Sequence, residues 1–227
     1  RPEGAAAAPV AVRLARAIAE TVAHLERGGL DRAAIARALA AHGIAGEGVT
    51  HRPGREDAAL ARRCIAALAN AGARLVEAGV LRAPSEVDLV AIGAGLMARH
   101  TGGPMYQADR RGMLILVRDL RLWADENPSL WQPAPLIERL WSDGARFARL
   151  DAAKALEVLK SQSGGAIELV ILDLGLPDLD GIEVLHGIRG WNHVPVVVLS
   201  ARASSDEKVA ALDAGADDYV TKPFEMN

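Results

Sequence analysis

The chain has 227 residues, of which 50% are hydrophobic and 24% charged, and its formal net charge at pH 7 is −3. This length allows one or two domains, and the apolar content is sufficient for a buried core in each. The single cysteine, Cys64, lies in a helical pattern; it excludes an intrachain disulfide framework and suits a reducing cytoplasm, where we expect the protein. No apolar run has the length of a membrane-spanning helix, and no basic patch interleaved with aromatic residues predicts a nucleic-acid site.

The basic residues divide the chain into two parts. Residues 1–150 contain 20 arginines and no lysine beside 16 acidic residues, whereas residues 151–227 contain four lysines and two arginines beside 13 acidic residues. The first part is therefore basic and the second acidic. Such a change of composition marks a domain boundary, so we predict a helical domain at 1–150 and a second domain at 151–227.

The first 150 residues have the apolar spacing of amphipathic helices and no strand pattern. Gly28 and Gly79 are placed to end two of these helices, and Pro84 to begin another. Residues 101–104 are expected to form a turn between helices, and residues 44–54 a loop. The predicted helices span residues 10–27, 30–41, 55–78, 84–96, 109–127 and 135–141.

Beyond residue 151, a predicted helix at 152–160 is followed by short apolar runs that each lead into a polar side chain. The predicted strands are residues 167–172, 194–199 and 218–221, and the polar residues after them are Asp173, Ser200 and Lys222. Parallel strands bring their carboxyl ends to one edge of a sheet, where open α/β folds bind ligands. A carboxylate, a hydroxyl and an ammonium group gathered there can support phosphoryl transfer, in which a nucleophile attacks while donors stabilise the oxygens.

The order and spacing of these motifs resemble the receiver domain of bacterial two-component response regulators, in particular the Kdp-type, OmpR-like regulators. The resemblance covers residues 152–225 and rests on LDLGLPDLDGIE, VPVVVLSAR and LDAGADDYVTKPF. It implies a flavodoxin-like (CheY-like) α/β fold with parallel strands, a histidine kinase as phosphate donor, and Mg²⁺ as cofactor. The loop acids Asp178 and Asp180 are expected to shape their loop.

The resemblance also assigns roles to single residues. Asp173 corresponds to the phosphoacceptor and Ser200 to the hydroxyl that moves toward the phosphoryl group. Tyr219 corresponds to the aromatic switch residue on the last strand. Lys222 corresponds to the lysine that pairs with phosphate, followed by a cis peptide bond to a proline. The backbone carbonyl of Gly175 corresponds to a metal ligand.

One part of the family's pattern is missing. Receivers hold Mg²⁺ with an acidic pair at the end of their first strand, and counting back from Asp173 reaches residues 130–133, where no apolar strand ends in two acids. Mg²⁺ requires several oxygen ligands beyond a single carboxylate. We therefore expect a receiver truncated at both ends, in which the strand before Asp173 forms a sheet edge and both Mg²⁺ binding and phosphorylation are impaired.

Residues 56–150 resemble a different family, the C-terminal helical domain of 3-hydroxyacyl-CoA dehydrogenases in fatty-acid oxidation. The resemblance rests on the stretches CIAALANAGARLVEAGV, PSEVD and GGPMYQAD. It implies a non-catalytic domain that supports a homodimer or contacts a dehydrogenase subunit. The sequence contains no dinucleotide-binding glycine fingerprint, because the glycines at 93 and 95 lack a preceding strand and a third glycine.

Three functions remain open from the sequence. The chain is a phosphoacceptor receiver module of a two-component system, a non-catalytic helical part of a β-oxidation dehydrogenase, or an inactive composite of the two. In each case we expect a helical domain followed by an incomplete α/β receiver, with no enzymatic activity assigned to the chain on its own.

Overall fold

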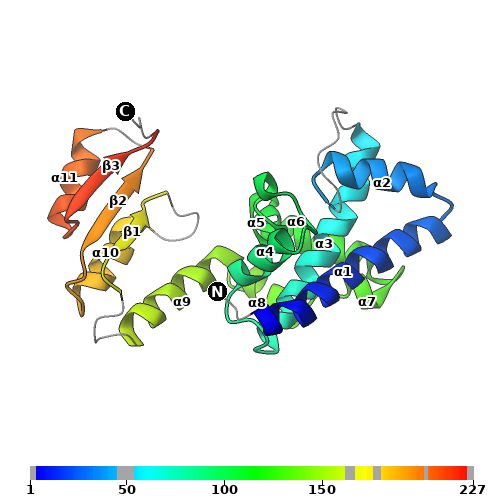
Figure 1. Ribbon diagram of the computed structural model, residues 1–227, viewed down its shortest axis with the longest axis horizontal. Helices are drawn as coiled ribbons and strands as arrows, with labels where there is room; N and C mark the ends of the chain where they lie inside the picture. Colours follow the sequence, from blue (N-terminus) through cyan, green and yellow to red (C-terminus); the bar gives the residue numbers. More distant parts are fainter. Residues whose placement is uncertain (1–3, 45–53, 162–166, 176–179, 202–203, 224–227) are drawn as a thin grey trace. The chain divides into compact units, whose positions relative to one another are not determined.

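The computed structural model describes residues 4–44, 54–161, 167–175, 180–201 and 204–223. The chain divides into two compact units, unit 1 at Arg1–Phe147 and unit 2 at Ala148–Asn227 (Figure 1). Over the described residues, unit 1 consists of helices and turns with one isolated antiparallel bridge between Ile44 and Met97, whereas unit 2 carries a parallel three-stranded sheet with helices. Each unit has its own buried apolar core.

Helix α3 is the element around which unit 1 is organised. It is contacted by α1, α2 and α5, among others, and many of its buried residues are alanines, which allow close approach of neighbouring helices (Figure 1). The elements of unit 1 are α1 (Gly4–Arg27), α2 (Arg32–Ala41), α3 (Arg55–Glu77), α4 (Pro84–Gly93), a 3₁₀ turn (Arg99–Thr101), α5 (Pro104–Arg111), α6 (Met113–Ala124), α7 (Pro128–Trp131) and α8 (Pro135–Ser142).

A fully buried amide on α3 fixes the chain between α7 and α8. The side-chain nitrogen of Asn70 donates to the carbonyl oxygens of Leu130 at 2.9 Å and Gln132 at 2.8 Å. Its oxygen accepts from the backbone nitrogen of Ala134 at 2.7 Å. Because the side chain satisfies three backbone groups at once, it holds this irregular segment against α3.

Several predicted helix bounds differ from the structure. A single helix was expected at 109–127, but Gly112, with φ of +95°, separates α5 from α6. That backbone conformation cannot continue a right-handed helix and suits glycine. Helix α4 ends at Gly93 instead of residue 96, followed by Gly95 at φ of +71°, and the short helix α7 was not predicted. Cys64 is buried as expected, and burial raises the pKa of its thiol to about 12.

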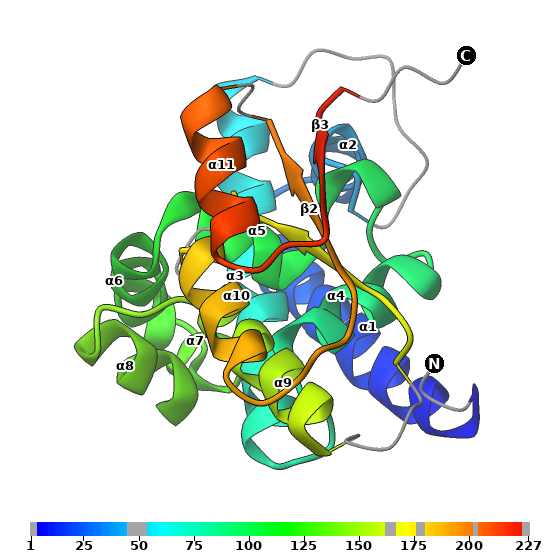
Figure 2. The same cartoon turned by 90° about the vertical axis from the view of Figure 1, so that its left-hand side faces the viewer.

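Unit 2 is built on a parallel sheet with strand order β1-β2-β3. Its elements are most of α9 (Phe147–Ser161), β1 (Val170–Asp173), α10 (Gly181–Arg189), β2 (Val196–Ser200), α11 (Ser205–Asp213) and β3 (Asp218–Thr221). Residues Leu172, Val198 and Tyr219 are aligned across the three strands and are buried. They share one apolar cluster with buried side chains of α10 and α11, so both helices cover the same face of the sheet (Figure 2).

The first strand of this sheet is less protected than the second. Among the described strands, β1 pairs with β2 alone. Ile171 of β1 points to the face opposite the helices α10 and α11 and is 63% exposed. Strand β1 forms an edge within the described part of the sheet, as expected. It begins at Val170 and is shorter than the strand predicted at 167–172.

None of the helices in the described ranges is long and apolar enough to cross a membrane.

Candidate functional site at the carboxyl edge of the sheet

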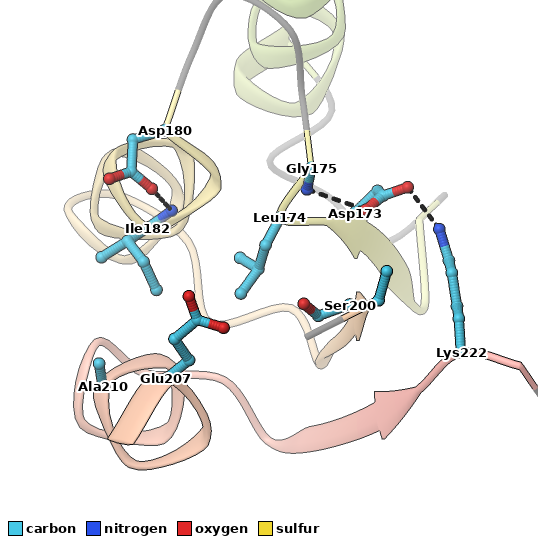
Figure 3. A pocket seen from close by; sticks show the side chains of 10 residues that line it. Asp173, Leu174, Gly175, Asp180, Ile182, Ser200, Glu207, Ala210 and Lys222 are labelled. Atoms are coloured by element: carbon cyan, nitrogen blue, oxygen red, sulfur yellow. Dashed lines mark hydrogen bonds and ion pairs between the residues drawn. The ribbon is translucent and has the colours of Figure 1, made fainter. Parts of the chain in front are cut away.

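The three polar residues that follow the predicted strands lie at one edge of the sheet. Asp173 ends β1, Ser200 ends β2, and Lys222 follows β3. Because the strands are parallel, with Asp173 paired to Leu199 and Ser200 paired to Thr221, these ends are neighbours. All three residues line a cavity of about 410 Å³ (Figure 3). The convergence expected from the sequence is therefore present in the structure.

Asp173 is held by two partners from different parts of the chain. Its Oδ2 atom lies 2.5 Å from Nζ of Lys222, and its Oδ1 atom accepts from the backbone nitrogen of Gly175 at 2.9 Å (Figure 3). The hydrogen bond from Lys222 is the main reason that the pKa of Asp173 is lowered; the Gly175 bond adds to this and partial burial opposes it. Asp173 is therefore a carboxylate at neutral pH, which is the form that can act as a nucleophile.

The other predicted site residues fall into two groups. Ser200, only 2% exposed, and Gly175 both line the cavity. Tyr219 does not line it and is 7% exposed in the apolar cluster. The peptide bond between Lys222 and Pro223 is cis, as the resemblance to receiver domains implied.

Two further carboxylates line the same cavity. Asp180 caps α10, where its Oδ1 atom accepts from the backbone nitrogen of Ile182 at 2.9 Å, in agreement with its expected role in the loop. Asp178 lies outside the described residues. Glu207, in the first turn of α11, directs its carboxylate into the cavity (Figure 3). Glu207 was not predicted, because an acid in a first helical turn is common for reasons of helix stability alone.

The charges of the lining residues decide which ions the cavity favours. Asp173, Asp180 and Glu207 contribute three negative charges, against the one positive charge of Lys222. An excess of carboxylates repels an incoming phosphate anion, whereas Lys222 and Ser200 can donate hydrogen bonds to it. The cavity thus contains a nucleophile and hydrogen-bond donors for phosphoryl transfer, but the negative net charge of its lining disfavours the binding of a phosphate anion.

The described residues do not form a complete Mg²⁺ site. Mg²⁺ takes six oxygen ligands in octahedral geometry. Asp173 is already occupied by Lys222 and Gly175, and the described ranges contain no group of three or more His, Cys, Asp or Glu side chains arranged to hold a metal ion.

Part of the chain, which includes the residues of this cavity, matches a known family of domains. Residues 136–227 match the family model of the response regulator receiver domain. The parallel sheet with helices in unit 2 is consistent with the fold of that domain. The match begins at residue 136, whereas the resemblance was expected to begin at residue 152.

Curated proteins that are similar to part of this chain include regulators named KdpE. The chain is 56% identical over 78 residues to the transcriptional regulatory protein KdpE of Mycobacterium tuberculosis, covering 34% of each chain. It is 65% identical over 57 residues to the KDP operon transcriptional regulatory protein KdpE of Escherichia coli, covering 25% of each. The chain thus spans about a third or less of these relatives' length.

A solved structure gives a weaker comparison. The receiver domain of a Francisella response regulator is 37% identical, and the alignment covers 33% of this chain and 60% of that one. Its TM-score of 0.29 is too low to support any argument about the fold. None of these matches supports the dehydrogenase resemblance of residues 56–150, which stays a prediction.

Proposed function

We propose that unit 2 is a receiver module of a two-component signalling system in which Asp173 accepts a phosphoryl group. The observation that carries the proposal is the contact of Asp173 with Lys222 inside a cavity that Ser200 also lines. Two relatives named as KdpE regulators support the proposal, since they are 56% and 65% identical to this chain over 78 and 57 residues. A histidine kinase is the proposed donor.

The proposed reaction follows from the positions of these groups. An oxygen of Asp173 attacks the phosphorus of the donor, the bond from phosphorus to the donor's leaving group breaks, and an aspartyl phosphate forms. For a phosphohistidine donor the broken bond is P–N, and for acetyl phosphate it is P–O with acetate as the leaving group. Lys222 neutralises part of the negative charge on the transferred oxygens, and Ser200 donates a hydrogen bond to one of them.

We further propose that the receiver is incomplete and that its phosphorylation is slow. Three features support this: β1 is an edge within the described part of the sheet, carboxylates outnumber Lys222 in the cavity, and the donor set does not fit Mg²⁺. The roles of Tyr219 as a switch and of Gly175 as a carbonyl ligand are part of the same proposal. They require a rearranged or completed site, since Tyr219 is buried in the core.

The experiment is labelling of the whole chain with acetyl phosphate, with and without Mg²⁺, followed by mass spectrometry of the acyl phosphate. We expect slow labelling at Asp173 that changes little with Mg²⁺ and is absent in Asp173→Asn. Fast, Mg²⁺-dependent labelling would overturn the proposed impairment. Labelling equal in the wild type and Asp173→Asn would overturn the phosphoacceptor role.

A further inference from the structure

A groove on unit 1 runs along α1 and is separate from the receiver cavity. Two adjoining hollows, of about 140 Å³ and 430 Å³, form the groove. Both are lined by Arg16 and Glu20 of α1 and by Ser129 of α7, so they are continuous. The helices α1, α3 and α7, which provide nearly all of the lining, pack against one another (Figure 1).

The groove is strongly basic. Its lining includes Arg13, Arg16 and Arg27 on α1 and Arg74 on α3. Glu20 is the single acidic lining residue, and it is paired with Arg16 at 2.6 Å. Within the described part of the chain, Arg13, Arg27 and Arg74 make no ion pair with a carboxylate. The lining therefore has three positive charges that its own acid does not balance.

Arg74 is a fixed guanidinium within this lining. Its NH1 nitrogen donates to the carbonyl of Ser129 and its NH2 nitrogen to the carbonyl of Gln132, each at 2.7 Å. Burial lowers the pKa of Arg74 from its ordinary value. The described partners of this partly buried cation are neutral carbonyls. An anion should therefore bind more strongly to Arg74 than to a fully hydrated arginine. Its two hydrogen bonds leave other N–H groups available to a ligand.

The floor beside Arg74 is made of small or apolar residues. Ala17, Ala67, Ala71 and Leu130 line the smaller hollow together with Arg74. The volume of about 140 Å³ corresponds to roughly four or five waters in the liquid. This is room for one compact anionic group, and the larger hollow continues from there toward Arg27.

The spacing of the arginines favours a ligand with more than one anionic group. Arg13 and Arg16 are three residues apart and lie on one side of α1, close enough for one small ligand to contact both. Arg27 lies about 21 Å from Arg13 along the helix axis, at 1.5 Å per residue, and is too far away to bind the same small ligand. Guanidinium groups bind phosphate oxygens through paired, charge-assisted hydrogen bonds, and phosphates carry more charge than carboxylates.

We propose that this groove binds a small ligand that carries two or more phosphate groups, one of them at Arg74 and the others at Arg13 and Arg16, which line the same hollow. The site is distinct from the phosphoacceptor cavity and does not depend on the function proposed for unit 2.

The test is calorimetric titration of the whole chain with inorganic tripolyphosphate at low ionic strength. We expect binding that is tighter than for monophosphate or citrate and that weakens with added salt. Arg13→Ala should weaken it roughly fivefold or more, as expected for loss of a charge-assisted hydrogen bond. Arg37→Ala is the matched control, because Arg37 is an exposed arginine on α2 outside the groove. It should leave the affinity nearly unchanged.

Two further variants assign the binding to the groove. Lys222→Ala should leave the affinity unchanged, because the receiver cavity is a different site. Arg74→Lys keeps the charge but loses the forked geometry, and it should weaken binding while circular dichroism shows an intact helical content. Equal losses in Arg13→Ala and Arg37→Ala, loss in Lys222→Ala alone, equal affinity for citrate, or no binding at millimolar tripolyphosphate would each overturn the proposal.

Discussion

Nζ of Lys222 lies 2.5 Å from Oδ2 of Asp173, although the two residues are 49 positions apart in the sequence. The contact exists because β1 and β3 are parallel to β2 and end at the same edge of the sheet. It couples the charge of the proposed phosphoacceptor to the residue that we expect to pair with the phosphoryl group. Its effects can be measured without phosphorylation.

Replacing Lys222 with Ala should raise the pKa of Asp173. The hydrogen bond from Lys222 is the largest cause of the lowered pKa, and partial burial, which acts in the opposite direction, would remain. The carboxyl carbon of Asp173, followed by NMR during a pH titration, reports the change directly. Lys222→Arg keeps a cation and should keep the pKa low. An unchanged pKa in Lys222→Ala would show that the ion pair does not form in solution.

The same ion pair predicts a dependence of stability on acid. A carboxylate with a lowered pKa in the folded state stabilises the fold above its unfolded pKa of about 3.9, and this contribution is lost as the pH falls through the folded value. In Lys222→Ala the free energy of unfolding should therefore decrease less as the pH is lowered below about 4 than it does in the wild type. Urea unfolding at a series of pH values measures this difference.

Replacing Glu207 with Gln should accelerate labelling of Asp173 by acetyl phosphate. Glu207 places a carboxylate in the cavity, and its removal lowers the repulsion felt by an incoming phosphate. A unit charge several ångströms away contributes about 1 kcal/mol when partly screened, so we expect a roughly two- to tenfold faster rate. The assay is the initial rate of acyl phosphate formation.

Asp206→Asn is the control for Glu207→Gln. Asp206 is the preceding residue in the first turn of α11, is exposed, and does not line the cavity. Both variants remove one negative charge from the same helical turn. If both change the rate equally, net charge and not the position of Glu207 in the cavity controls labelling.

The sequence predicted the strand ends better than the surrounding cavity. Asp173, Ser200 and Lys222 each follow an apolar run, and parallel pairing alone brings them together. Glu207 could not be predicted in this way, because an acid after a serine cap has an ordinary role in starting a helix. The strand prediction at 167–172 was too long, since apolar residues such as Leu169 also occur outside the sheet.

In unit 1 the helices were predictable from spacing, but their interruptions and shared surfaces were not. A glycine within an apolar helical pattern is often tolerated, so the break at Gly112 required knowledge of its φ angle. The basic groove joins residues of α1, α3 and α7, and no local pattern indicates that these segments meet. Tertiary packing decides both features.

Two glycines near α4 should respond in opposite directions to alanine. At Gly103, with φ of +95°, an added Cβ would lie 2.4 Å from Oδ1 of Asp88, the carboxylate that accepts from Met105 N at 2.7 Å. Gly103→Ala should therefore destabilise α5 by at least about 1 kcal/mol. At Gly93, the last residue of α4, a Cβ meets nothing within 4 Å, and Gly93→Ala should stabilise the helix by up to about 1 kcal/mol.

Hydrogen exchange of the peptides that cover α4 and α5 measures both glycine variants locally. Faster exchange in Gly103→Ala and slower exchange in Gly93→Ala are expected. The same direction of change in both variants would contradict the backbone geometry at Gly103.

Arg189 connects the end of α10 to the segments that lead into β2 and β3, and its replacement by Lys should destabilise unit 2. Its Nε atom donates to the carbonyl of Gly215 at 2.7 Å, NH1 donates to the carbonyl of Val194 at 2.7 Å, and NH2 lies 2.8 Å from Asp217 Oδ2. The same Asp217 oxygen accepts from the backbone nitrogen of Val196 at 2.7 Å. A lysine ammonium cannot reach three partners in these directions, so part of this partly buried polar network would be left unsatisfied.

We expect Arg189→Lys to cost about 1 to 3 kcal/mol of unit 2 stability, as for loss of hydrogen bonds to partly buried groups. Trp191 is the single tryptophan of unit 2, and its fluorescence in a background with Trp123, Trp131 and Trp141 replaced by Phe reports unfolding of this unit in urea. Arg118→Lys is the control, because Arg118 is an exposed arginine in unit 1 whose hydrogen bonds reach Asp119. A loss in Arg189→Lys no larger than in this control would mean that the three contacts of Arg189 do not hold α10 to the sheet.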